Sequence, residues 1–199
     1  MKRIAITIAL CAAATASAQA QMSGMNTMKS RSAGFFLGAG FEGTGIRSTD
    51  AGSPTESGAG GGLLVGYGLN NTWSLFAQGS GANINENSGA GTYTLGHLDL
   101  GARVHFRAGP NAVVPFLQFG LSGRSASSTV NGSTSTGTGG GVFAGGGLNV
   151  HMTPSVALSG AVTWAFGSFS NFSVDGGTVD AGSVDATSAR VHLGLVWFP

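Results

Sequence analysis

The sequence predicts an all-β protein, an eight-stranded antiparallel up-and-down transmembrane β-barrel. Three observations lead to this prediction. Apolar residues alternate with small or polar ones through most of the chain, which is the period-2 pattern of strands with two different faces. Charged residues make up only 9% of the chain, against about 25% in ordinary soluble domains, while hydrophobic residues remain at 42%. Short turns and longer loops alternate between the predicted strands, as they do in transmembrane β-barrels.

Residues 1–20 have the features of a secretory signal peptide. Two basic residues precede an apolar run over residues 4–14, and an A-x-A cleavage pattern ends at Ala20. The run is about half the roughly 20 residues that a membrane-spanning helix needs. The protein is therefore expected to leave the cytoplasm. The single cysteine, Cys11, lies within this segment, so the mature chain is expected to have no disulfide.

Residues 21–32 lack alternation and are interpreted as a flexible N-terminal leader, and residues 33–199 as one barrel domain. Each predicted strand reaches the 9–11 residues, roughly, that a tilted membrane strand needs. The strands are expected at 33–45, 58–69, 72–83, 91–106, 112–124, 139–151, 156–169 and 188–199. Short turns are expected at 70–71, 107–111 and 152–155, and longer loops at 47–57, 84–90, 125–138 and 170–187.

The apolar face of these strands is expected to meet lipid and the polar face to line the interior. Between Ser125 and Val174 the sequence has no Asp, Glu, Lys or Arg, which suits a lipid-facing surface better than a water-facing one. The chain has nine Lys and Arg, and removal of Lys2 and Arg3 leaves seven against eight Asp and Glu. This near-neutral balance argues against nucleic acid as a partner.

Aromatic residues are expected to form a girdle at each edge of the apolar band. On the side of the short turns they are Phe35, Tyr67, Trp73, Phe106 and Trp197. On the side of the long loops they are Trp164 and Phe166.

The chain resembles the small eight-stranded outer membrane barrels related to the transmembrane domain of outer membrane protein A. The resemblance covers nearly the whole mature chain and rests on the alternation, the signal peptide, the order of turns and loops, and the last strand. In that strand Gly194 is followed three residues later by Trp197, although such barrels usually finish on Phe and this chain finishes on Pro199. The resemblance implies a multi-pass protein of the cell outer membrane with both termini in the periplasm. It also implies contact with outer membrane lipid, lipopolysaccharide, periplasmic chaperones and the barrel assembly machinery, and we expect a monomer.

Five titratable side chains are expected to share the barrel interior as a charge network: Glu42, Asp99, Arg103, Arg190 and His192. Glu42 and Arg190 lie at similar heights on neighbouring strands. Because a buried unpaired charge costs several kcal/mol, we expect these two to pair.

No catalytic, cofactor-binding or metal-binding residues are predicted. His97 and His105 are eight residues apart on one strand and do not converge with His192. The repeated Asp175, Asp180 and Asp185 do not follow the ligand spacing of a known calcium loop, and a solvated acidic loop explains them better.

The sequence favours a non-enzymatic outer membrane protein of structural or surface-interaction type. One alternative is a narrow channel for ions or small apolar solutes, because many inward glycines would leave space. A second is a lipid A-modifying enzyme, which is disfavoured because His97 and Asp99 form an inward pair that a lipid could not reach. A third is a soluble periplasmic lipocalin-like barrel, which requires the apolar face to point inward.

Overall fold

A computed structural model describes residues 32–49, 54–86, 91–106, 112–130, 132–179 and 182–199. The predicted signal peptide and all of the predicted leader except Ser32 lie outside these residues. Among the residues described, no helix is long and apolar enough to cross a membrane.

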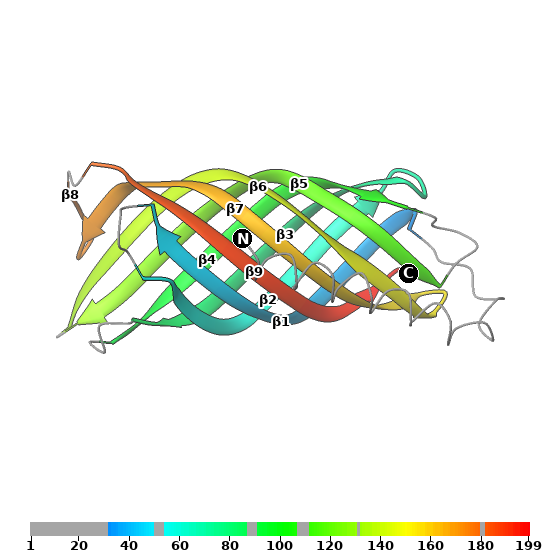
Figure 1. Cartoon of the computed structure of the whole chain (residues 1–199), viewed down its shortest axis with the longest axis horizontal. Helices are drawn as coiled ribbons and strands as arrows, with labels where there is room; N and C mark the ends of the chain where they lie inside the picture. The colour runs from blue at the N-terminus through cyan, green and yellow to red at the C-terminus, as the bar shows by residue number, and fades with distance from the viewer. Residues whose placement is uncertain (1–31, 50–53, 87–90, 107–111, 131, 180–181) are drawn as a thin grey trace, which may run out of the picture.

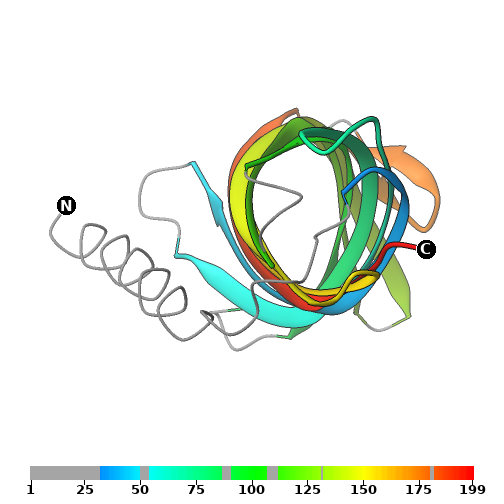
Figure 2. The ribbon, with the colours of Figure 1, turned by 90° about the vertical axis from the view of Figure 1, so that its right-hand side faces the viewer.

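The described chain is almost entirely β-strand, and every strand pairs antiparallel with its neighbours. The strands are β1 Gly34–Ser48, β2 Glu56–Gly68, β3 Trp73–Asn85, β4 Thr92–His105, β5 Val113–Val130, β6 Ser133–Thr153, β7 Val156–Val174, β8 Gly177–Val179 and β9 Val184–Trp197. Their order in the sheet is β6-β5-β4-β3-β2-β1-β9-β7-β8, and an additional β6–β7 pairing closes it. Figures 1 and 2 show the resulting closed barrel from the side and end-on.

Eight strands close this barrel, because β8 pairs only with the end of β7 and lies outside the ring. The predicted eight-stranded up-and-down barrel is therefore confirmed. One end, here called the turn end, carries the β2–β3, β4–β5 and β6–β7 connections and the chain end after β9. The opposite end, here called the loop end, carries β8 and the remaining connections (Figure 1).

The outer face carries the apolar residues of the alternating pattern. Phe41 is 82% exposed and Leu63 is 70% exposed, values that a soluble protein of this size would not tolerate over a continuous surface. The observed burial pattern agrees with the inward and outward faces that were predicted for every strand. The lipocalin-like alternative required the reverse orientation and is therefore wrong.

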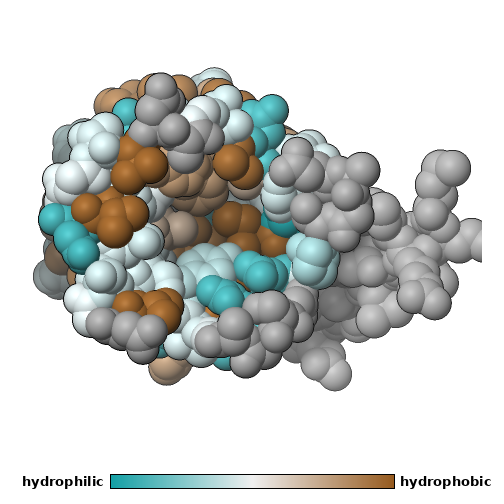
Figure 3. All heavy atoms as spheres, turned by 90° about the vertical axis from the view of Figure 1, so that its left-hand side faces the viewer, coloured by the Kyte–Doolittle hydropathy of each residue, from teal (hydrophilic) through white to brown (hydrophobic). Residues whose placement is uncertain are grey.

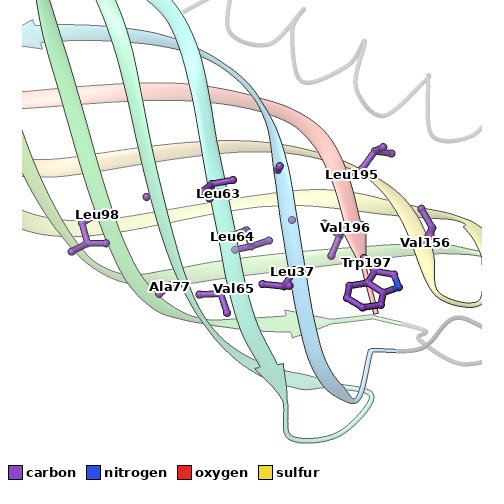
Figure 4. Close-up of a pocket in the computed structure, with 13 residues that line it drawn as sticks. Leu37, Leu63, Leu64, Val65, Ala77, Leu98, Val156, Leu195, Val196 and Trp197 are labelled. Carbon is purple, nitrogen blue, oxygen red and sulfur yellow. The ribbon is translucent and has the colours of Figure 1, made fainter. Parts of the chain in front are cut away.

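An apolar depression of about 750 Å³ lies on this outer face near the turn end (Figure 4). It forms where the small residues Ala39, Ala77 and Gly79 lie among larger ones such as Leu63 and Leu98. The outer surface therefore varies in relief where small residues replace large ones.

The strands extend further toward the loop end than the sequence predicted. Residues 125–138 were expected to form a loop, but β5 continues to Val130 and β6 begins at Ser133. Hydroxyl pairs join the two strands at this level, with Ser127 Oγ 3.2 Å from Thr136 Oγ1 and Thr129 Oγ1 3.0 Å from Thr134 Oγ1. Such cross-strand pairs stabilise a hairpin that has no apolar face.

The predicted loop at 170–187 is also partly strand. β7 continues to Val174, β8 occupies 177–179, and β9 begins at Val184. The predicted turns at 70–71 and 152–155 fall at the β2–β3 and β6–β7 connections, and the one at 107–111 lies outside the described residues. Asn70 accepts hydrogen bonds from the backbone N–H groups of Thr72 and Trp73, both at 2.8 Å, which is the local side-chain bonding that makes Asn a turn residue.

Aromatic rings fill the space beside several inward glycines. A Cβ built on Gly101 would lie 2.7 Å from Cζ of Phe143, and one on Gly147 would lie 2.7 Å from Cζ of Phe116. The ring of Phe36 covers Gly66 in the same way. These glycines therefore permit close packing, and the free space expected from them is occupied.

Candidate functional site: the barrel interior

The interior side chains form three levels between the two ends of the barrel. The turn-end cluster is apolar and consists of Phe36, Leu64, Phe76, Phe143, Ala157, Ala165, Val196 and Phe198. The loop-end cluster consists of Ile46, Ala82, Ile84, Leu95, Phe169 and Ala186, with Tyr93, Ala126 and Phe172 packed against it. Between them lies a layer of buried polar and charged side chains.

The C-terminal aromatic pair divides between the two faces of the barrel. Trp197 is 49% exposed on the outer face, whereas Phe198 is buried in the turn-end cluster. The Phe198 ring centroid lies 5.6 Å from that of Phe36 and 5.4 Å from that of His151, and its backbone N–H donates to the carbonyl of Ser155 at 2.7 Å. Phe198 therefore helps to close the interior at the turn end.

Arg190 pairs with Asp99 in the middle layer. Its Nη2 lies 2.5 Å from Oδ2 of Asp99, and both side chains are almost completely buried. The expected pairing of Arg190 with Glu42 is therefore wrong in its partner. Within the sheet Arg190 lies opposite Thr44, and Glu42 lies opposite His192. Comparing the heights of residues on adjacent strands therefore did not identify the partner of Arg190.

Glu42 is instead held by two hydroxyl groups. Ser80 Oγ donates to Glu42 Oε1 at 2.9 Å, and Thr44 Oγ1 donates to the same oxygen at 3.1 Å. Glu42 is 3% exposed. His192, the fifth residue of the expected network, is only partly buried.

Arg103 lies between two aromatic rings. Its guanidinium carbon is 4.1 Å from the ring centroid of Phe116 and 4.8 Å from that of Phe76, so the cation contacts the faces of both rings. Nη2 donates to Oε1 of Gln118 at 2.8 Å, and Gln118 donates in turn to Thr163 at 2.7 Å. This arrangement spans the barrel between β3, β4, β5 and β7.

Arg124 is a further buried cation that the sequence reasoning did not select. It is 3% exposed, and its Nη1 donates to the carbonyl of Ala186 at 2.7 Å. The signal was present, because Arg124 has the same parity as inward Gln118 and Ser122. It was overlooked because the strand was expected to end at this residue.

The structure brings two Ser–His pairs together, which sequence spacing did not reveal. His97 Nε2 lies 3.3 Å from Oγ of Ser188, and His105 Nε2 lies 3.0 Å from Oγ of Ser74. Both serines have no exposed surface. Among the described residues no group of three or more His, Cys, Asp or Glu could hold a metal ion.

All seven residues of the expected aromatic girdle point outward. Their exposed fractions lie between 44% for Trp73 and Phe106 and 57% for Tyr67. The seven are Phe35, Tyr67, Trp73, Phe106, Trp164, Phe166 and Trp197.

The loop end is hollowed, as Figure 3 shows, with apolar residues in its wall and both apolar and hydrophilic ones around its rim. A cavity of about 480 Å³ lies here, and we call it the loop-end vestibule. Its lining includes Tyr93, Ala126, Gly137, Phe169, Phe172 and Val184.

A closed barrel with a continuous apolar outer face and a polar layer inside defines a membrane-spanning outer membrane protein. A family model described as the outer membrane protein beta-barrel domain matches residues 6–196, and the chain belongs to this family. The predicted location in the outer membrane is thereby supported at the level of the family.

Solved structures of small outer membrane barrels share the fold. Neisserial surface protein A is similar with 20% identity and a TM-score of 0.62, over 83% of this chain and 97% of that one. Ail, the attachment invasion locus protein of Yersinia pestis, is similar with 15% identity and a TM-score of 0.55, over 83% and 98%. OprG from Pseudomonas aeruginosa has 12% identity and a TM-score of 0.57, over 85% and 98%. No curated protein matches the sequence.

Proposed function

We propose that this protein is a non-enzymatic outer membrane barrel of structural or surface-interaction type, whose loop-end surface meets molecules outside the cell. The observation that carries the proposal is the filled interior. At the turn end Phe36 packs on Phe198, and above them the ring of Phe76 lies 6.0 Å from that of Phe143. Arg103 is stacked between two rings at the next level. A barrel filled in this way favours activity at its surface over transport through it.

The extended hairpin of β5 and β6 is the part of the loop end best suited to a contact. β6 has 21 residues and β5 has 18, whereas β2 and β3 have 13 each. Residues 125–138 are rich in Ser, Thr and Gly and carry no charge. This hairpin offers hydroxyl groups beyond the apolar band, and these suit hydrogen bonding to polar partners such as glycans. Ail, which shares the fold, is by its printed name an attachment protein.

The test uses intact cells of a non-adherent Gram-negative host that carry the protein. Removal of four pairs from the hairpin, residues 127–130 and 133–136, shortens it in register while residues 131–132 still join the strands. We expect the shortened protein to fold and insert, and binding of cells to glycan arrays or epithelial cells to fall to the level of the empty host. Binding that persists at the full level would refute the role of this hairpin. Absence of binding by the complete protein would leave a structural role.

A narrow channel is the second candidate, and the open loop-end vestibule is the observation that favours it. Passage would require the turn-end cluster to move aside. Planar bilayer recordings separate the candidates, because the filled interior predicts no stable conductance steps. Steps that disappear when Phe198 is replaced by a bulkier Trp would favour the channel.

An enzymatic role, including modification of lipid A, is not part of the proposal. In the described part of the chain, Ser74 and Ser188 contact histidine and are fully buried, so a lipid substrate could not reach either nucleophile. We further propose a monomer with both termini in the periplasm. Its partners would be outer membrane lipid, lipopolysaccharide, periplasmic chaperones and the barrel assembly machinery.

A further inference from the structure

The loop-end vestibule is closed at its floor by packed side chains. Ile84 and Leu95, two members of the loop-end cluster, have no exposed surface. Glu86 and Tyr93 follow them toward the loop end, two residues away along the chain and on the same inward side, and both line the vestibule. The volume of about 480 Å³ lies within the range of roughly 300–1,000 Å³ that small-molecule sites occupy. The vestibule is therefore shaped to hold a small molecule that enters from the loop end.

The wall of the vestibule is apolar and aromatic. A Cβ built on Gly137 would lie 3.2 Å from Cε1 of Phe172 and 3.6 Å from Cδ1 of Phe169, so the two rings flank this glycine. Val184 lies opposite Phe169 in the sheet and also lines the cavity. Tyr93 adds a third ring, which packs against the loop-end cluster. Such a wall suits an apolar body, and the faces of its rings also attract cations.

The charges around the opening are mostly negative. Glu86 lines the vestibule, and Glu56 accepts a hydrogen bond of 2.8 Å from the hydroxyl of Tyr93, which lines it too. The described residues of the loop end include four acids and one base, namely Glu56, Glu86, Asp175, Asp185 and Arg47. The potential at the opening therefore favours a cationic group over an anionic one.

A buried cation next to the floor sets the orientation of a charged ligand. The guanidinium carbon of Arg124 lies 5.9 Å from the ring centroid of Phe169. Ala126, the next inward residue on β5 toward the loop end, lines the vestibule, whereas Arg124 lies outside the lining. A positive group is therefore disfavoured near the floor and favoured near Glu86. A ligand with one charge would enter with its apolar part first.

We propose that the loop-end vestibule binds a small hydrophobic cation, an amine or quaternary ammonium compound with an apolar or aromatic body. The body packs against Phe169 and Phe172, and the ammonium group lies near Glu86 and the ring of Tyr93. An amphiphile of the same size with a carboxylate head is disfavoured, because its charge would meet Glu86. This proposal goes beyond the surface contact proposed above and does not rest on it, since it concerns a small solute inside one protein molecule.

The test is nuclear magnetic resonance of the full mature chain with 13C-labelled alanine and valine methyl groups, in nanodiscs of zwitterionic lipid at pH 7. The probe is benzyltrimethylammonium, which combines an aromatic body with a permanent charge. We expect saturable shifts of the methyl signals of Ala126 and Val184, which line the vestibule. Tetramethylammonium lacks the body and phenylacetate reverses the charge, and each should bind at least about tenfold more weakly.

Two matched variants separate the vestibule carboxylate from the general field of the loop end. Glu86→Gln should raise the dissociation constant of benzyltrimethylammonium about fivefold, the effect of one ion pair in contact with water. Asp185→Asn removes the same charge from an exposed residue outside the lining and should change it by less than about twofold. Ala126→Leu places a larger side chain in the cavity and should abolish the saturable shift of Val184.

The site is disproved if the two wild-type methyl signals do not respond to benzyltrimethylammonium. Equal affinity for phenylacetate would overturn the choice of a cation, and equal affinity for tetramethylammonium would overturn the role of the apolar wall. Equal effects of Glu86→Gln and Asp185→Asn would show attraction by the loop end as a whole without a site. If Ala126→Leu does not fold, the ligand series on the wild-type protein and the two charge variants still decide the question.

Discussion

The pair of Arg190 and Asp99 should be strongly coupled in stability, and this is the most exacting consequence of the interior packing. Both side chains are almost completely buried, and the contact distance of 2.5 Å places their charge centres roughly 4 Å apart. Unit charges at that separation attract by about 4 kcal/mol at the effective dielectric constant of about 20 that suits protein sites. Removal of one partner leaves the other as a buried unpaired charge, which typically costs about 3–5 kcal/mol.

We expect Arg190→Met and Asp99→Asn each to lower the free energy of unfolding by about 3 kcal/mol. The double variant should lose much less than the sum, with a coupling energy of about 2–3 kcal/mol, because no charge of this pair then remains. The measurement is urea unfolding of the protein in short-chain phosphatidylcholine vesicles. The cycle between Glu42→Gln and Arg190→Met is the comparison and should give a smaller coupling, since Glu42 bonds to two hydroxyl groups and makes no direct contact with Arg190. Additive effects of the Arg190 and Asp99 changes, or stronger coupling to Glu42, would refute the assignment.

Three further predictions concern the outer face, the glycines and the chain end. Leu100→Arg should lower the free energy of unfolding in vesicles by about 2–4 kcal/mol, because Leu100 faces lipid near the middle of its strand. Thr94→Arg, on the same face nearer the loop end, should lower it by less than about 1 kcal/mol. Equal losses would contradict the assignment of this face to lipid. Gly66→Ala should destabilise the protein by about 1–3 kcal/mol, because the new Cβ would meet the ring of Phe36. Gly79→Ala should be neutral or slightly stabilising, because there is open space around Gly79. The reverse order of the urea midpoints would show that the Phe36 ring does not pack on Gly66. Phe198→Ala should lower the thermal unfolding midpoint and cost about 3 kcal/mol by leaving a cavity, and an unchanged midpoint would show that the chain end does not close the interior.

The membrane-spanning part of the fold could be predicted from the sequence because the two faces of each strand meet different surroundings and therefore carry different residue types. Where lipid meets one face and the interior the other, apolar Leu98 and Leu100 must alternate with polar His97 and Asp99, and the period is visible. The same signal disappears above the membrane. Over residues 125–138 Ser, Thr and Gly occur at both parities, so the strands continue without an alternation of apolar and polar residues to reveal them.

The interior contacts could be predicted only by residue type. Parity places Glu42, Asp99, Arg103 and Arg190 inside, as observed. Their partners depend on which strands face one another across the barrel, and this depends on the stagger between strands. The sequence does not encode that stagger in a local pattern, so Arg190 was assigned to Glu42 on the adjacent strand instead of Asp99 across the interior.

The most direct test of the membrane orientation uses the three tryptophans as depth probes. Trp73, Trp164 and Trp197 are all the tryptophans of the chain, and all three lie on the outer face. In vesicles of brominated phosphatidylcholine we expect strong quenching of their fluorescence. It should be strongest with bromine near the headgroups, where an aromatic girdle lies, and weak quenching by aqueous iodide should accompany it. Strong quenching by iodide with none by the brominated lipids would contradict a lipid-facing outer surface and with it the membrane-spanning barrel.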